Sequence, residues 1–415
     1  MIKIGLGRAP QAFNIFKSHE ADWFFKRTLE QMCEKGAEIG ECLYTARQID
    51  ETDRNSWINE WTALGDCLKL SGDKSLNMGH KVSAREAYLR ASNYYRAVEG
   101  GALPSDERFH EAWSKNVQAF KKAAELFNPA VRCVEIPFEG KMLPGYFWSP
   151  DESGEPRPTL FISGGNDSWI EELFNFLAPG AHRRGYNFFT FDYPGHRGAV
   201  HLYPDCIKRP DFEVPFKAAF DYLETLPGVD DRIALAGYSF GGYVAPRVTI
   251  HEPRVKALIA DCPLIYAYDI TRKAFEDILD NKIPKEKLQA LLEEKMKNEP
   301  IFEAYREYAL WTLGFSGKTM MDYMKSDLIR QFTIVDDLHK ISCPTLSLVS
   351  EDEGEIFLEQ STRFHEGISS IKKELKILSL SKDGTNDHCQ LDNISKGQQL
   401  IFDWLDSIFE YRYVQ

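Results

Sequence analysis

The stretch Ile233-Ala-Leu-Ala-Gly-Tyr-Ser-Phe-Gly-Gly-Tyr243 decides the fold. Its first four residues are apolar and predict a short buried strand, which the glycine-rich segment ends. From Tyr243 onward the sequence favours a helix. The pattern G-x-S-x-G between a strand and a helix is typical of a sharp turn that holds a serine, here Ser239, in a strained backbone conformation. An ordinary turn can show the same pattern, so this interpretation depends on the rest of the chain.

Other apolar runs on both sides of this stretch predict a sheet. Between the runs lie segments with helical periodicity, at 171–183, 212–225 and 395–409. Strands that alternate with helices at this spacing predict an α/β fold with a mostly parallel sheet and helices on both faces. The remaining predicted strands are 131–138, 142–148, 159–162, 186–192, 255–261, 344–350 and 375–380.

The composition changes along the chain and predicts two domains. Residues 1–128 form an all-helical N-terminal domain in this prediction, with Ser83 and Ser105 or Asp106 as helix caps. Residues 129–415 form the catalytic α/β domain. Within it, 262–340 interrupt the strand pattern with charged helical sequence. An insertion there would lie above the carboxyl ends of the strands, so we expect a helical lid, the alternative being a solvated surface decoration.

The bulk properties exclude several classes of protein. The 415 residues carry a net charge of −13, which argues against a nucleic-acid binder. No run approaches the ~18 apolar residues of a membrane span. The eight cysteines are scattered without a C-x-x-C pair or clustered histidines, so we expect reduced thiols, a cytoplasmic location and no metal. Neither G-x-G-x-x-G nor a Walker motif is present, so no cofactor is expected.

A serine nucleophile needs a histidine base and a carboxylate that orients this base. On a sheet of this kind the partners follow in the order Ser, acid, His, each just after a strand. His388 follows the last predicted strand and is the predicted base. The turn after 344–350 offers the acid: Asp352 is preferred, Glu353 fits the spacing about as well, and Asp261 after the preceding strand is an outside alternative.

An oxyanion hole would use two backbone N–H groups. One is that of Phe240, directly after the serine, and the other comes from the glycine-rich loop after 159–162, at Gly165 or Asn166. Among the other histidines, His339 and His365 fall on predicted helices. His196 and His201 follow an earlier strand and are left open as residues that face a substrate pocket.

In the order of its motifs the chain resembles the α/β-hydrolase superfamily. Its front half is similar to the branch that contains 2,6-dihydroxypseudooxynicotine hydrolase, the fermentation-respiration switch protein and hydrolases that shorten aromatic polyketides in pigment pathways. The resemblance departs from the usual pattern where Ser163-Gly-Gly replaces His-Gly-Gly. The motifs that carry it are Ser163-Gly-Gly, Asp192-x-Pro-Gly, Gly237-Tyr-Ser-Phe-Gly-Gly, Cys343-Pro-Thr-Leu, Asp387-His-Cys-Gln, Arg85-x-x-Tyr-Leu-Arg-Ala-Ser-Asn-Tyr-Tyr-Arg-Ala and Asp106-x-Arg.

The resemblance implies an enzyme that cleaves a carbon–carbon bond next to a carbonyl, and a homodimer. Such a cleavage needs a leaving carbanion stabilised by a second carbonyl or an aromatic ring. We therefore predict a serine hydrolase acting on a small molecule, a β-dicarbonyl or aromatic polyketide-like compound. The alternatives are a carboxylesterase or thioesterase, a peptidase of the acylaminoacyl-peptidase kind, and a binding protein on a hydrolase scaffold.

Overall fold

The structure, a computed structural model, describes residues 14–274 and 285–413. The described chain divides into two compact units. One contains residues 133–274 and 318–413 and holds the sheet, and the other contains residues 14–132 and 285–317 and is helical. Among these residues, no helix is long and apolar enough to cross a membrane.

The sheet has eight strands in the order β1-β2-β4-β3-β5-β6-β7-β8. The run from β4 through β3, β5, β6 and β7 to β8 is parallel, and β2 pairs with β4 antiparallel. Each of the predicted strands is present within a few residues of its expected bounds, and the predicted α/β class is confirmed. The strands are β1 (Arg132–Phe138), β2 (Lys141–Trp148), β3 (Arg157–Ser163), β4 (Asn187–Phe191), β5 (Val229–Tyr238), β6 (Val255–Asp261), β7 (Thr345–Ser350) and β8 (Lys373–Leu378).

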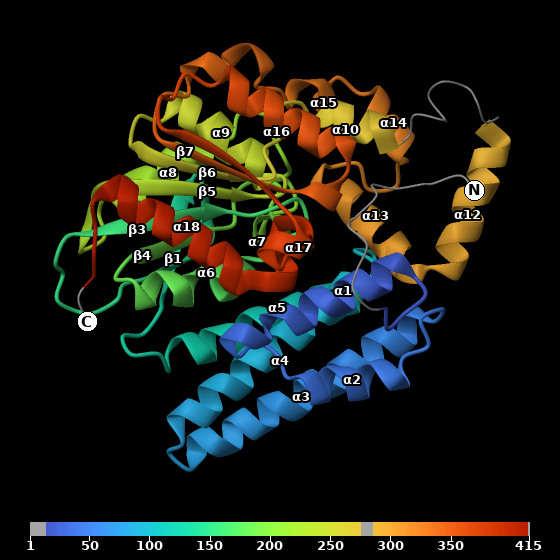
Figure 1. The fold of residues 1–415 in the computed structure, drawn as a ribbon. Coiled ribbons are helices and arrows are strands. Elements are labelled where there is room, and N and C mark those ends of the chain that lie inside the picture. Colours follow the sequence, from blue (N-terminus) through green and yellow to red (C-terminus); the bar gives the residue numbers. More distant parts are fainter. Residues whose placement is uncertain (1–13, 275–284, 414–415) are drawn as a thin grey trace. The chain divides into compact units, whose positions relative to one another are not determined.

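Helices cover both faces of the sheet, as Figure 1 shows. The helices α6 (Ile170–Arg183) and α18 (Ile394–Phe409) pack on one face, and α8 (Glu213–Leu223), α9 (Gly241–His251) and α16 (Glu355–Gly367) on the other. The central strands β3, β4, β6 and β7 are buried over nearly their whole length because both faces are covered, whereas the edge strands β1 and β8 are partly exposed. Shorter helices of this unit are α7 (Arg197–Leu202), α10 (Ala267–Ala274), α14 (Met320–Lys325), α15 (Leu328–Gln331), η2 (Val335–Lys340), η3 (Glu351–Glu353), α17 (Leu380–Asp383) and η4 (His388–Asn393).

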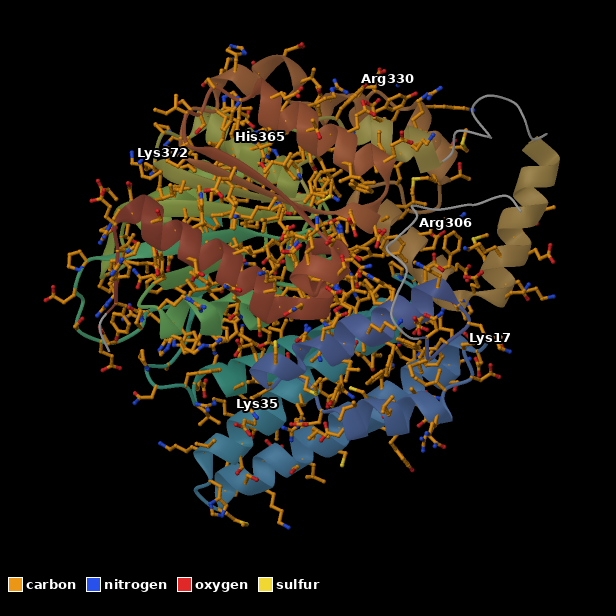
Figure 2. All side chains as sticks on the ribbon, in the orientation of Figure 1. Lys17, Lys35, Arg306, Arg330, His365 and Lys372 are labelled. Carbon is orange, nitrogen blue, oxygen red and sulfur yellow. The ribbon has the colours of Figure 1, made fainter. Side chains whose placement is uncertain are left out.

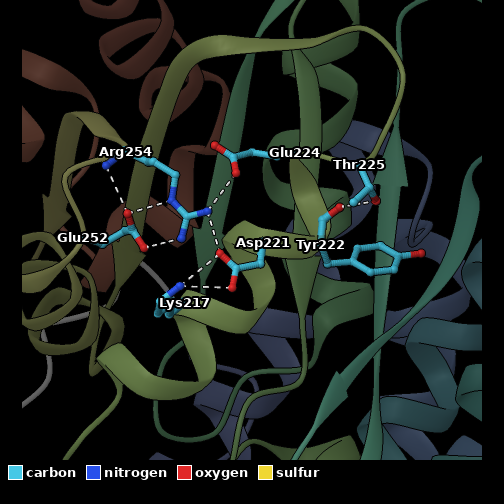
Figure 3. Close-up of polar contacts among 7 residues, drawn as sticks. All are labelled: Lys217, Asp221, Tyr222, Glu224, Thr225, Glu252 and Arg254. Atoms are coloured by element: carbon cyan, nitrogen blue, oxygen red, sulfur yellow. Dashed lines mark hydrogen bonds and ion pairs between the residues drawn. The ribbon is translucent and has the colours of Figure 1, made fainter.

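Two histidines set aside from catalysis lie on helices, as predicted. His365 belongs to α16 and is labelled in Figure 2, and His339 belongs to η2. An ion-pair network joins α8 to the segment after α9 (Figure 3). In it, Arg254 bonds Glu252, Asp221 and Glu224, and Lys217 bonds Asp221. Glu252 is buried, but the other four side chains of the network reach solvent, so the network contributes little to stability.

The helical unit is built on a pair of long helices, α3 (Arg54–Asn77) and α4 (Lys81–Gly101). They approach closely because α3 presents glycines to tyrosine rings of α4. A Cβ on Gly65 would lie 2.7 Å from the Tyr95 ring, and one on Gly72 would lie 2.6 Å from the Tyr88 ring. The other helices are α1 (His19–Leu29), η1 (Glu30–Glu34), α2 (Ile39–Gln48), α5 (Glu107–Ala124), α12 (Lys285–Asn298) and α13 (Pro300–Thr312).

The two predicted helix caps have different outcomes. Asp106 caps α5, and its carboxylate accepts a hydrogen bond of 2.9 Å from the Arg108 N–H. Ser83 was the wrong cap, because α4 begins two residues earlier, at Lys81, with His80 at the N-cap position. The helix therefore starts where the chain leaves the turn after α3, and Ser83 lies within its first turn.

We expected the segment 262–340 to form one continuous insertion. Residues 285–317 instead pack with the N-terminal helices, while 318–340 belong to the unit that contains the sheet. On α13, Trp311 meets the ring of Phe109 edge-on at 5.2 Å, and Glu303 pairs with Arg54 at 2.6 Å. These long-range contacts follow from no local pattern. They assign residues 285–317 to the helical unit, and so the segment 262–340 is divided between the two units.

Candidate active site

The predicted turn at Ser239 is present between β5 and α9. Ser239 has a φ of 58°, a left-handed conformation that is uncommon for residues other than glycine. Its N–H donates to the Asp261 carbonyl oxygen at 3.0 Å, and its own carbonyl oxygen accepts from Gly242 N–H at 2.7 Å. The strained residue is thus held on both sides by backbone hydrogen bonds.

Two glycines around the serine are required by close packing. A Cβ on Gly237 would lie 1.9 Å from the Gly241 carbonyl oxygen, and a Cβ on Gly241 would lie 2.5 Å from that of Ser163. No side chain fits at either distance, so the glycines of the motif allow the strand to turn directly into the helix.

His388, the predicted base, follows β8 and begins η4. Its Nδ1 lies 2.7 Å from Oε2 of Glu353, the acid left as an alternative. The preferred acid, Asp352, does not pair with His388; its carboxylate accepts a hydrogen bond of 2.7 Å from the Asn386 side chain. The geometry therefore corrects the choice of partner from Asp352 to Glu353.

The local reason for this choice is the short helix η3. Ser350 and Glu353 form a capping box, in which Oε1 of Glu353 accepts from Ser350 N–H at 3.1 Å. This contact turns Glu353 inward, where its side chain is buried, while Asp352 is exposed. Burial alone would raise the pKa of Glu353, but the charge and hydrogen bond of His388, with further bonds from Cys262 and Ser350, hold it below its ordinary value.

Cys262 completes the surroundings of this pair. Donor atoms of Cys262, Glu353 and His388 lie within 4.8 Å of one another. Burial, followed by the nearby charge of Glu353, raises the pKa of the thiol well above its ordinary value. The neutral thiol hydrogen-bonds the Glu353 carboxylate and helps to keep it ionised.

Asp261, the outside alternative for the acid, plays a different part. It is fully buried, and burial together with the charge of Glu353 raises its pKa to about 8. Its Oδ1 accepts from the Gln390 amide at 3.1 Å, and its backbone carbonyl receives Ser239 N–H. Asp261 thus links the serine turn to the loop that carries His388.

The predicted oxyanion loop lies against the serine. A Cβ on Gly165 would be 2.8 Å from the Cβ of Ser239. The N–H of Gly165, however, donates to the Ser168 hydroxyl at 2.7 Å, so it is already engaged. Phe240 is the N-cap residue of α9, where backbone N–H groups have no acceptor within the helix. Of these two predicted donors, the Phe240 N–H therefore suits an oxyanion better than the Gly165 N–H.

In the loops that carry Ser239, Asn166 and His388, these predicted site residues are more exposed than most of their neighbours. Within 233–246, only Ser239 and Phe240 are partly exposed and the others are buried. Asn166 is likewise the partly exposed residue of 159–170, and His388 that of 385–391. The backbone therefore buries its neighbours and leaves the predicted reacting groups accessible.

The segment after β4 supports the oxyanion loop from within. Tyr193 donates its hydroxyl to the Gly164 carbonyl oxygen at 2.8 Å. His196, left open above as a pocket residue, is 1% exposed and pairs through Nδ1 with Asp192. Its Nε2 has no hydrogen-bond partner among the described residues and faces Gly164, where a Cβ would lie 2.6 Å away. His196 is therefore in contact with the loop. His201, the other histidine left open, is partly exposed at the end of α7.

Lys208 is a residue that the sequence reasoning missed. It is 4% exposed, its ammonium pairs with Oδ1 of Asn166, and it lies 4.6 Å from the centre of the Phe240 ring. No local pattern distinguishes it from other lysines, since only the folded chain shows that it is buried beside two predicted oxyanion residues.

Comparisons with known proteins agree with this geometry. Residues 51–329 match the FrsA-like esterase family. The chain is 32% identical to hydrolase LUC6 of Fusarium sp over 96% of this chain and 98% of that one, and 29% identical to 20-hydroxy-prefusarin hydrolase FUS2 of Gibberella moniliformis over 95% and 98%.

Among solved structures, 2,6-dihydroxy-pseudo-oxynicotine hydrolase is similar with a TM-score of 0.69 and 22% identity, covering 93% of this chain and 97% of that one. At this identity the likeness shows the fold alone. The motif order, the sheet and the sequence relatives lead to the same assignment, and the enzyme class predicted from the sequence is confirmed. The chain belongs to the FrsA-like esterase family of α/β hydrolases, and it is a hydrolase.

Proposed function

We propose that the protein is a serine hydrolase that cleaves a carbon–carbon bond next to a carbonyl in a β-dicarbonyl or aromatic polyketide-like small molecule. The observation that carries the catalytic part is the His388–Glu353 pair at 2.7 Å, together with an accessible, strained Ser239 on a neighbouring loop. Both loops are joined through Asp261, which bonds the backbone of one and the side chain of the other.

In this proposal His388 takes the proton of Ser239 as the hydroxyl attacks the substrate carbonyl. Glu353 holds Nδ1 of His388 in its protonated tautomer, so that Nε2 is the basic atom, and stabilises the imidazolium that forms. Ser350 N–H and the Cys262 thiol keep this carboxylate ionised and fixed in place.

The tetrahedral intermediate carries a negative oxygen, which the N–H groups of Phe240 and Asn166 would stabilise. The carbon–carbon bond then breaks, and its electron pair moves onto the leaving carbon. A second carbonyl accepts this pair as an enolate, which the imidazolium protonates. Water activated by His388 finally hydrolyses the ester on Ser239.

The names of the relative and of the family bear on the substrate class. The relative FUS2 is named as a hydrolase of 20-hydroxy-prefusarin, which favours a small organic substrate. The family itself is described as esterase-like, and this favours ester hydrolysis by the same groups as the second candidate. A leaving alkoxide needs no second carbonyl, so the two reactions can be separated by substrate.

The test combines labelling with turnover. A fluorophosphonate should modify Ser239, as peptide mapping would show, and Ser239→Ala should abolish both labelling and cleavage. Ser71→Ala, an exposed serine on α3, is the matched control and should behave as the unchanged protein. A folded protein in which Ser239 stays unlabelled would contradict the catalytic proposal. Cleavage of benzoylacetone would favour the carbon–carbon reaction, and hydrolysis of p-nitrophenyl acetate alone would favour the esterase.

We also propose that the described parts of the predicted lid that belong to the unit with the sheet, 262–274 and 318–340, cover the substrate, that the protein is a homodimer, and that it is cytoplasmic. The scattered cysteines support the last of these. Light scattering on the purified protein would measure the oligomeric state, and a mass of one chain, 47.6 kDa, would contradict the dimer.

A further inference from the structure

Lys208 lies in the segment between α7 and α8, and its backbone is tightly fixed. A Cβ on Gly195, which has a φ of 79°, would lie 2.4 Å from the Cα of Lys208. The N–H of Gly195 also donates to the Cys206 carbonyl oxygen at 2.8 Å. The segment that carries the lysine is thus packed against the loop after β4, which itself supports the oxyanion loop.

A lysine this deeply buried is normally paired with a carboxylate. An ammonium group has three N–H donors. Among the described residues, the only hydrogen-bond acceptor paired with Lys208 is the neutral amide oxygen of Asn166. No carboxylate forms an ion pair with it in the described part of the chain, and two of its donors have no protein acceptor there. The buried ammonium is therefore short of a negative partner.

The pKa of Lys208 agrees with this lack of a negative partner. Burial lowers the pKa of Lys208 to about 7, and the charge of Asp167 opposes the shift only in part. Arg197 binds the backbone carbonyl of Asp167 at 3.3 Å and stacks on Trp169, so a second cation also lies near this acid. An anionic group beside Lys208 would restore the charged form.

The position of the ammonium relates it to the reacting serine. Among the described residues, the ammonium contacts the side chains of Asn166 and Phe240, two of the residues predicted to form the oxyanion hole. Gly165 precedes Asn166 in the chain, and a Cβ on Gly165 would lie 2.8 Å from the Cβ of Ser239. Phe240 follows Ser239 directly in the chain. Both side chains that the ammonium contacts thus belong to neighbours of residues at the serine turn, so the charge lies beside the predicted oxyanion hole.

We propose that Lys208 binds the second carbonyl oxygen of the substrate as it becomes an enolate, and that it thereby selects β-dicarbonyl compounds over simple esters. This inference rests on the proposed function. As the carbon–carbon bond breaks, the electron pair passes through the α-carbon to this oxygen, where the ammonium neutralises it. The proton that later reaches the carbon comes from the imidazolium of His388, so Lys208 stays protonated throughout.

The experiment compares two substrates in two lysine variants. Lys208→Met should lower kcat/KM for benzoylacetone by about 10²-fold or more, as expected when one donor to a developing oxyanion is removed. For p-nitrophenyl acetate, whose leaving group needs no such partner, the change should be about threefold or less. Lys217→Met, on the exposed face of α8, is the control and should change neither rate. Equal losses on both substrates would show that Lys208 only holds the oxyanion loop, and would overturn the inference, as would no loss on either.

A second experiment measures binding of the substrate and needs no catalysis. Benzoylacetone added to Ser239→Ala should bind as its enolate, with the ultraviolet absorption of that form, and Lys208→Met in the same background should abolish the spectral change. Absence of the enolate signal in Ser239→Ala, or its persistence without the lysine, would overturn the inference. Failure of the proposed function is separate, because it would appear as a lack of benzoylacetone cleavage by the unchanged enzyme.

The dependence of kcat/KM on pH is a third test of the proposal. Because the ammonium is the charged form, kcat/KM for benzoylacetone should fall as pH rises through about 7. Lys208→Arg keeps its charge at higher pH, so this fall should move upward or vanish. The profile for p-nitrophenyl acetate should lack the fall, and a fall of the same size for both substrates would count against Lys208.

Discussion

Replacing Glu353 with Gln tests which carboxylate orients the base. The substitution keeps the size of the side chain and removes its charge. A glutamine amide can donate to Nδ1 of His388, which would place the imidazole proton on Nε2, the atom that must accept the proton of Ser239. In serine proteases the comparable change lowers kcat by about 10⁴-fold, which corresponds to about 5 kcal/mol of transition-state stabilisation. We expect a loss of this order.

The matched variant is Asp352→Asn. Asp352 is exposed and bonds the Asn386 side chain, so this change should alter kcat by about threefold or less. The assay is initial-rate hydrolysis of p-nitrophenyl acetate and of benzoylacetone, with circular dichroism to confirm the fold. Equal losses in both variants, or a Glu353→Gln enzyme that keeps more than about a tenth of its kcat, would refute the assignment.

The same variant predicts a pH dependence of stability. The pKa of Glu353 is lower in the folded protein than its ordinary value of 4.5. Its ionised form therefore stabilises the fold above about pH 4.5, and this contribution is lost as the pH falls through the folded-state pKa. The difference in unfolding free energy between the unchanged protein and Glu353→Gln should be present at pH 7 and should shrink in acid. A difference that grows in acid would contradict the sign.

Two further substitutions test the surroundings of the serine. Gly165→Ala would place a methyl group 2.8 Å from the Cβ of Ser239, so kcat should fall by about 10²-fold or more, with circular dichroism to confirm that the fold is kept; near-normal kcat would show that the loop can move aside. Asp261→Asn acts on a carboxyl group whose pKa is raised from 3.8 to about 8, and such a group costs stability increasingly as pH rises between these values. The variant should therefore gain thermal stability relative to the unchanged protein between pH 5 and pH 8, and a gain that is constant with pH would show that Asp261 is ionised in the fold.

Much of the architecture could be predicted because it depends on local patterns. The buried strands are mostly apolar runs, and the motif around Ser239 requires a strand on one side and a helix on the other. His388 could be named from its place after the last strand. Each of these inferences uses residues that are neighbours in the chain.

Other features depend on contacts that no local pattern reveals. Asp352 and Glu353 are adjacent acids in one turn, and the capping bond from Ser350 decides which of them faces His388. Residues 285–317 join the helical unit through contacts with helices more than 150 positions earlier in the chain, such as that of Trp311 with Phe109. Neither outcome follows from residue type or spacing alone.

The sequence by itself thus determined the class of fold and the serine turn and named His388 as the proposed base, because hydrophobic periodicity and glycine placement act over short stretches of chain. Only the tertiary structure showed which carboxylate pairs with His388, that the Gly165 N–H is engaged and that Lys208 is buried. Side-chain direction within a turn and the depth of a charged group are set by packing between distant segments. The turn around Ser239 is a local feature of the chain, whereas its partners acquire their protonation and orientation from the folded surroundings.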